Sequence, residues 1–246
     1  MTWADHALAV WLVVVSPVAS VWSTSRLRRR IESGDGRARI RFYVWGIAEY
    51  WTVTLVVWIL WQWTGRPFAA LGMVAPAGTA AWITVALCVA TVIFYATQIH
   101  SVLVSEAAQA SLRAQIERSP GVRIVIPTSA AEMRAFVAVG VTAGICEELL
   151  YRGFVLWYLS ALLPRGWAIV AAVAIFGIGH AYQGARNVLM TAMVGGIALA
   201  VYLWTGSLIA PMVMHAVVDL ANGFIGYRST TGDGVATPTH DGVTAQ

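Results

Sequence analysis

The sequence predicts an all-α membrane protein, a polytopic helical bundle of about seven transmembrane helices within a range of six to eight. Its 246 residues are 59% hydrophobic and only 11% charged, whereas a soluble domain is about 25% charged. Apolar stretches near the roughly 20 residues that span a bilayer recur along the chain. No sheet is expected, because backbone in lipid must satisfy its own hydrogen bonds and a helix does so internally.

Seven apolar stretches are candidate spans. They are approximately 7–22, 43–63, 79–100, 134–162, 167–182, 186–204 and 207–226. The first and fifth are short for a bilayer and can be tilted or re-entrant. We expect residues 1–226 to form a single transmembrane domain. Residues 227–246 are polar and rich in Gly and Thr, and we expect them to be a disordered tail.

Arginines in the segments between spans predict the orientation. Residues 23–42 carry seven arginines and residues 101–133 carry three, whereas residues 64–78 carry one. The positive-inside rule makes the first two segments cytoplasmic and the third external. With seven spans, the N-terminus lies outside and the C-terminal tail inside. The net charge of +4 arises mostly from these short segments, so no nucleic-acid partner is predicted.

The fourth candidate span contains three ionisable residues within the stretch "GICEELLYRGFVLW", residues 144–157. Glu148 and Arg152 are four apart in the order that favours an ion pair on one helix face. Glu147 lies about 100° around the helix from Glu148, which leaves its carboxylate free for chemistry. The alternative is a structural pair beside a snorkelling Glu. Ionisable residues inside a membrane usually line a cavity or a pathway.

Two further spans carry histidines. "FGIGHAYQG" puts His180 near the end of the fifth span, with Phe176 one turn earlier, and "PMVMHAVVDL" puts His215 and Asp219 four apart on the last span. A carboxylate one turn away can hold an imidazole in one tautomer and orientation. Each histidine alone could equally be a hydrogen-bonded core residue. Together with Glu147 they come from three helices, and a shared polar centre is the simpler explanation.

In chain order these motifs resemble those of the CPBP family, the CAAX prenyl endopeptidases and bacteriocin-processing intramembrane proteases. "EELLYR" matches its Glu-Glu-x-x-x-Arg motif, "FGIGH" its Phe-x-x-x-His motif and "HAVVD" its His-x-x-x-Asn/Asp motif. The resemblance covers roughly residues 130–226, the expected catalytic part. It implies an intramembrane endopeptidase in which Glu148 and Arg152 form a structural pair, with Phe176 as a further supporting residue.

The same resemblance implies roles for four catalytic residues. Glu147 and His180 would activate a water, and His215 and Asp219 would complete the site and help to stabilise the oxyanion. The family often has Asn at the last position, where this chain has Asp219. An ionised carboxylate cannot donate a hydrogen bond to an oxyanion, so orienting His215 or binding a metal is the more suitable role for Asp219.

Two mechanisms are open at this stage. In one, Zn²⁺ acidifies the water, and the candidate ligands are Glu147, His180, His215 and Asp219, as in a metalloprotease. The chain has no H-E-x-x-H helix, so these ligands would converge from separate helices. In the other, Glu147 and His180 act directly and no cofactor is required. We favour the second.

Other functional classes remain as alternatives. Buried Glu, His and Asp also build relays in proton- or ion-coupled transporters, and a non-catalytic membrane scaffold can retain the same residues. The expected partners are the lipid bilayer and a membrane-associated peptide or protein substrate. The sequence does not predict the oligomeric state. We expect a multi-pass protein of the cell membrane, the inner membrane in a bacterium.

Overall fold

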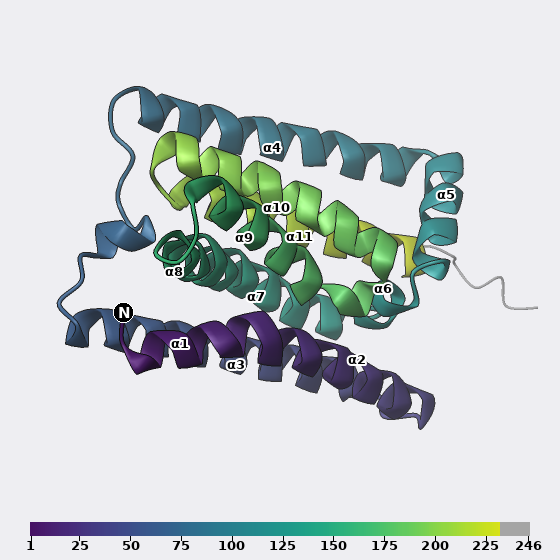
Figure 1. The fold of residues 1–246 in the computed structure, drawn as a ribbon. Helices are drawn as coiled ribbons and strands as arrows, with labels where there is room; N and C mark the ends of the chain where they lie inside the picture. The colour runs from purple at the N-terminus through teal and green to yellow at the C-terminus, as the bar shows by residue number, and fades with distance from the viewer. Residues whose placement is uncertain (232–246) are drawn as a thin grey trace, which may run out of the picture.

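The computed structural model describes residues 1–231, and all regular structure in this part of the chain is helical. The long helices lie side by side in one bundle, with the N-terminus at one end and the last turns of the final helix at the other (Figure 1). Five helices of the described part are long and apolar enough to cross a membrane. The predicted all-α polytopic bundle is therefore confirmed.

The first helical rod is longer than the sequence suggested. It consists of α1 (Trp3–Val10), a π-helical segment η1 (Trp11–Val15) and α2 (Ser16–Glu32), which follow one another without a break. The predicted span 7–22 was too short at both ends. The helix continues through the arginines, and Leu27 among them is buried in a cluster with Ala38 and Ile124.

The second rod is α3 (Ala38–Trp63), and only residues 33–37 separate it from the first. The segment 23–42 is therefore mostly helical and not an irregular connection. Gly34 turns the chain with a φ of 83°, a left-handed conformation that glycine adopts without steric cost. After α3, a short 3₁₀ turn η2 (Phe68–Leu71) leads to the next rod.

The third rod, α4 (Thr79–Val104), lies at the edge of the bundle along the last helix (Figure 1). Its side chains are mostly exposed in the protein alone, as expected of a helix that faces lipid. Two short helices follow, α5 (Glu106–Glu117) and α6 (Pro120–Val125). The Ser105 hydroxyl caps α5 by accepting from the Ala108 N–H at 3.2 Å.

The fourth rod carries the paired glutamates. It runs through α7 (Ala130–Glu147), a π-helical segment η3 (Glu148–Val155) and α8 (Leu156–Ser160). The fifth, α9 (Arg165–Gly179), is apolar but shorter than the other rods, as its predicted span indicated.

The last two rods are α10 and α11. A 3₁₀ turn η4 (Ala181–Gln183) precedes α10 (Ala185–Thr205), and α11 (Ile209–Thr231) follows a turn at Gly206. The predicted tail began at residue 227, but α11 extends its helix to Thr231. Residues 232–246, the rest of the predicted tail, lie outside the described residues.

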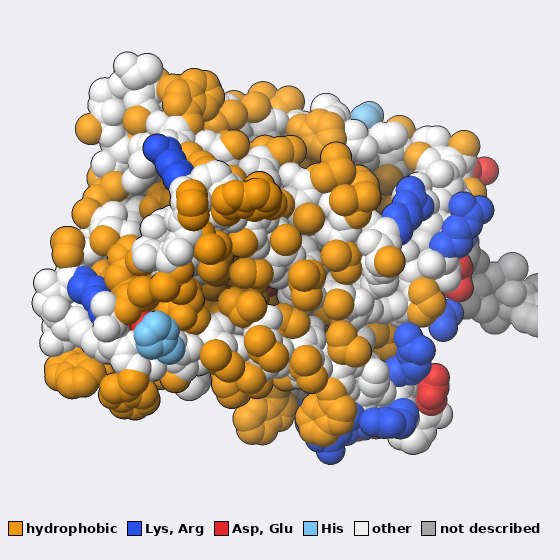
Figure 2. Space-filling view, in the orientation of Figure 1, with side chains coloured by type: hydrophobic (Ala, Val, Ile, Leu, Met, Phe, Trp, Pro, Cys, Tyr) orange, Lys and Arg blue, Asp and Glu red, His pale blue; other side chains and the backbone are white. Residues whose placement is uncertain are grey.

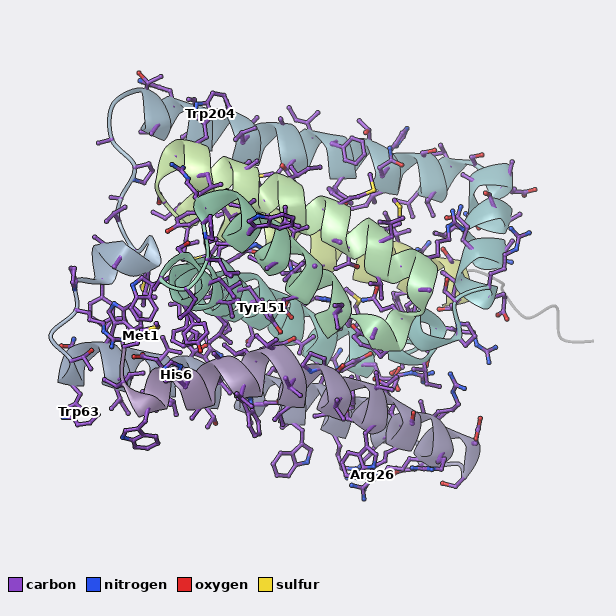
Figure 3. The ribbon with its side chains drawn as sticks, viewed as in Figure 1. Met1, His6, Arg26, Trp63, Tyr151 and Trp204 are labelled. Carbon is purple, nitrogen blue, oxygen red and sulfur yellow. The ribbon has the colours of Figure 1, made fainter. Side chains whose placement is uncertain are left out.

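Apolar and basic side chains occupy different parts of the surface, as expected of a membrane protein. Apolar side chains cover the middle of the bundle, and most of the visible arginines gather at the end where α2 terminates and α5 and α6 lie (Figure 2). Figure 3 shows Arg26 toward this end and Trp63 near Met1 at the other. The two arginine-rich segments therefore share one end, as the predicted orientation requires. The protein is a multi-pass membrane protein.

Candidate active site

Close packing of α7 against α11 brings the paired glutamates next to the last helix. A Cβ on Gly144 would lie 2.7 Å from the backbone nitrogen of Ala216, closer than real contacts allow, and a Cβ on Gly140 would meet the Asp219 Cβ at 3.3 Å. The missing side chains let the two backbones approach, as small residues do between membrane helices. This contact sets the distance between the EELLYR segment and the HAVVD segment.

The π-helical segment η3 contains the EELLYR motif except for Glu147, and all eight residues of Glu148–Val155 are buried. A π-helix has i→i+5 hydrogen bonds, is rare, and is found frequently at functional sites. The change from α-helix to π-helix falls between Glu147, the last residue of α7, and Glu148, the first of η3. Both glutamates have right-handed helical backbone angles, but their carboxylates have different partners.

The predicted Glu148–Arg152 ion pair is confirmed. Arg152 Nη1 lies 3.0 Å from Glu148 Oε1, and both side chains are almost fully buried. Arg152 also donates to the Gly195 carbonyl at 3.1 Å, and its guanidinium lies 3.8 Å from the centre of the Phe176 ring. The ion-pair contact does not have hydrogen-bond geometry, and Glu148 Oε2 has no hydrogen-bond partner among the described residues. The attraction is therefore mainly between charges in a water-poor interior.

Glu148 has a second partner that the sequence did not indicate. Its Oε1 atom lies 2.7 Å from Nδ1 of His215. Since an ionised carboxylate can only accept, Nδ1 of His215 carries the proton in this contact. The predicted orienting group was Asp219, but its Oδ2 lies 3.6 Å from Nε2 of His215, beyond a hydrogen bond. Glu148 therefore orients His215, and Asp219 stands on the opposite side of the ring.

His180 is fixed by the helix that precedes it. It directly follows α9, and its Nδ1 lies 2.9 Å from the carbonyl oxygen of Phe176. A carbonyl only accepts, so Nδ1 carries the proton and Nε2 faces the glutamate side of the site. The ring of Phe176 meanwhile lies over Arg152. Phe176 thus supports two parts of the site, one through its backbone and one through its side chain.

Glu147 is the carboxylate left outside the ion pair. It is 4% exposed, and its Oε1 atom accepts a hydrogen bond from the Tyr50 hydroxyl. Its Oε2 atom is buried without a hydrogen-bond partner among the described residues. Oε2 lies 3.8 Å from Nε2 of His180 and 4.0 Å from Nε2 of His215. These separations exceed a direct hydrogen bond and are of the kind that a bridging water spans.

A cavity of about 650 Å³ extends from these residues toward α5 and α6. Glu147, His180 and Asp219 are part of its wall, and so are Gln115 of α5 and Tyr182 of η4. The phenol of Tyr182 can donate a hydrogen bond into the cavity. The cavity combines apolar walls with a polar end at Glu147, His180 and Asp219.

The four candidate metal ligands are Glu147, His180, His215 and Asp219, and they do not form a metal-binding group in this arrangement. Zinc ligands lie about 2.0–2.2 Å from the ion in a tetrahedral arrangement, which sets donor atoms about 3.3–3.6 Å apart, closer than the 3.8 Å and 4.0 Å separations around Glu147 Oε2. Within residues 1–231 no set of three or more His, Cys, Asp or Glu side chains is arranged to hold a metal ion.

The fold and this cluster define an integral membrane protein with a buried glutamate–histidine centre beside a cavity. Residues 129–221 match the family model described as type II CAAX prenyl endopeptidase, Rce1-like, and this segment includes the EELLYR, FGIGH and HAVVD motifs. This match supports the assignment of residues 129–221 to the CAAX protease (CPBP) family, as the motifs predicted. Neither the curated proteins nor the solved structures yield a match.

Proposed function

We propose that the protein is an intramembrane endopeptidase in which Glu147 and His180 activate the attacking water directly. The observation that carries the proposal is the unpartnered Oε2 atom of Glu147. It is buried, lies in a cavity wall, and is within about 4 Å of two imidazole nitrogens. A buried carboxylate oxygen normally has a partner, and one held free beside two imidazoles is suited to a general base.

The hydrolytic step uses Glu147 as the proton carrier. A water between Glu147 Oε2 and His180 Nε2 gives one proton to Glu147 while its oxygen attacks the carbonyl carbon of the substrate. His180 orients the water by accepting its second hydrogen at Nε2. When the C–N bond breaks, Glu147 returns its proton to the leaving amine nitrogen. The second hydrogen of the water remains with the new carboxyl group, so atoms and charge balance.

The negative charge on the tetrahedral intermediate requires a donor in a water-poor site. His215 fills this role when its ring carries both protons, because Glu148 holds Nδ1 and Nε2 is then free to donate. Asp219 faces the same nitrogen at 3.6 Å. As an ionised carboxylate it cannot donate, so we assign it the role of stabilising the charged His215 ring.

The substrate is a membrane-associated peptide or protein, and the reaction as proposed needs no cofactor. The cavity reaches α5 at the arginine-rich end, so the cleaved segment enters from the cytoplasmic side of the cell membrane. The family is described by its action on prenylated CAAX sequences. The proposal for this chain is limited to a substrate segment that reaches the buried centre from that side.

The test compares protein termini in membranes from cells that carry the wild-type protein or Glu147→Gln. Newly formed N-termini should be present with the wild type and absent with the variant. The matched control is Glu117→Gln, the same change at an exposed carboxylate of α5, which should retain the wild-type pattern. Identical termini in all three samples, with the proteins folded and equally abundant, would refute the proposal. Proton or ion flux in liposomes that depends on Glu147 would then favour the transporter alternative, and its absence would favour a scaffold.

A further inference from the structure

The second oxygen of the proposed base is held by a residue from outside the family segment. Tyr50 belongs to α3, which packs along α7, and its hydroxyl donates to Oε1 of Glu147. The family match begins at residue 129, so the N-terminal half of the chain supplies a direct contact to the candidate active site. The contact joins residues 97 positions apart in the sequence.

This contact divides the two oxygens of Glu147 between two tasks. Oε1 is bound by Tyr50, and Oε2 is directed toward the histidines. A carboxylate without such a contact could rotate about its terminal torsion, which is broad, and present either oxygen or neither. The hydroxyl of Tyr50 therefore limits Glu147 to the orientation in which Oε2 faces His180 and His215.

No other described residue shares this contact with the Glu147 carboxylate. Arg152 is already paired with Glu148, and in the described chain no arginine lies within ion-pair distance of Glu147. His180 and His215 approach Oε2 of Glu147 to 3.8 Å and 4.0 Å without a hydrogen bond. Among the described residues only Tyr50 makes a hydrogen bond to the Glu147 carboxylate.

We propose that Tyr50 is a positioning residue for the reaction, which holds the general base Glu147 with Oε2 toward the water. The assignment rests on the proposed function, because it gives Glu147 the role of base. It adds α3 to the functional unit of the protein. Tyr50 does not itself touch the reacting atoms; it acts through Glu147.

The test is Tyr50→Phe in the full-length protein, purified in detergent and assayed on the substrate identified from the membrane comparison. The change removes one oxygen atom and keeps the ring, so the helix packing is retained. We expect kcat to fall about 10- to 100-fold, the effect of losing a hydrogen bond to a charged group, with KM within about twofold of wild type.

The matched control is Tyr158→Phe. It removes a hydroxyl that is also hydrogen-bonded, to Nδ1 of His6 at 2.8 Å, but lies outside the cavity wall. This variant should keep the wild-type kcat. The infrared carboxylate band of Glu147, identified as the band lost in Glu147→Gln, gives a readout that needs no substrate. Its frequency should shift in Tyr50→Phe, because the carboxylate loses the hydrogen bond from the Tyr50 hydroxyl, and should stay at the wild-type value in Tyr158→Phe.

The outcomes separate the two proposals. If Glu147→Gln abolishes cleavage but Tyr50→Phe retains the wild-type kcat and the wild-type infrared frequency of Glu147, the role of Tyr50 is refuted and the proposed function stands. If Glu147→Gln cleaves like the wild type, the proposed function fails and the role of Tyr50 in the reaction fails with it. If Tyr50→Phe unfolds, an unchanged infrared frequency in Tyr50→Trp, which also lacks the hydroxyl, would overturn the assignment.

Discussion

Arg152→Ala should destabilise the folded protein strongly, because it leaves the buried carboxylate of Glu148 without its arginine partner. Removing one partner of a buried ion pair costs about 3–5 kcal/mol. The substitution also removes the hydrogen bond to the Gly195 carbonyl and the guanidinium over the Phe176 ring. Interactions around one side chain do not add simply, so we expect a loss of at least about 3 kcal/mol. The free energy of unfolding of a native protein is only about 5–15 kcal/mol. A loss of this size therefore leaves less folded protein, and the purified yield should also fall.

The assay is a double-mutant cycle with Arg152→Ala, Glu148→Gln and both together, read as reversible unfolding in detergent. The exposed pair of Arg123 and Glu117, with its closest atoms 3.4 Å apart, is the matched control and should couple by no more than about 1 kcal/mol. The buried pair should couple by at least about 2 kcal/mol. If the losses of unfolding free energy in the two single variants add up to the loss in the double variant, the Glu148–Arg152 contact contributes nothing and the reasoning is wrong.

Three further predictions concern catalysis and topology. Glu147→Gln should lower the rate of single-turnover cleavage by about 10²–10⁴-fold, and His180→Ala should lower it by a similar factor. Because the two residues act as one unit, the double variant should be little slower than either single variant. A double variant whose loss equals the product of the two single losses would contradict this. Asp219→Asn should be milder than either, because an amide can still face His215 and can also donate; a loss as large as that of Glu147→Gln would show that the negative charge is required. A single cysteine at Asp35 should be labelled only from the cytoplasmic side of intact cells, and labelling from outside would reverse the orientation.

The local relations in the site could be predicted from sequence because each depends on spacing within one helix. The i, i+4 order of Glu148 and Arg152 predicts their pair, and the separation of Glu147 from that pair follows from the helical angle. The four-residue step from Phe176 to His180 likewise corresponds to the hydrogen bond between them. These relations hold whatever surrounds the helix, so one sequence is sufficient to propose them.

The contacts between helices could not be predicted in this way. Tyr50 is one aromatic residue among many in α3, and nothing in its neighbourhood in the sequence points to a carboxylate 97 positions later. The Glu148–His215 contact depends on how α7 and α11 are packed. Gly140 and Gly144 indicate that some helix approaches closely, but they do not identify which one. The π-helical geometry is equally hidden, because the same apolar residues suit an α-helix.

The π-helical segment also constrains which length changes the gene can tolerate. Each i→i+5 hydrogen bond closes a turn that holds one residue more than an α-helical turn, so the segment Glu148–Val155 behaves like an α-helix that has accepted an insertion. Deleting a single residue between positions 149 and 151 would favour the α-helical turn and leave Glu148 and Arg152 three residues apart, so the buried pair would have to form with a different offset along the helix face. Such a deletion would preserve hydropathy and helical propensity along the rod. It would nevertheless be selected against, whereas a deletion in the exposed residues 33–37 would be tolerated far better.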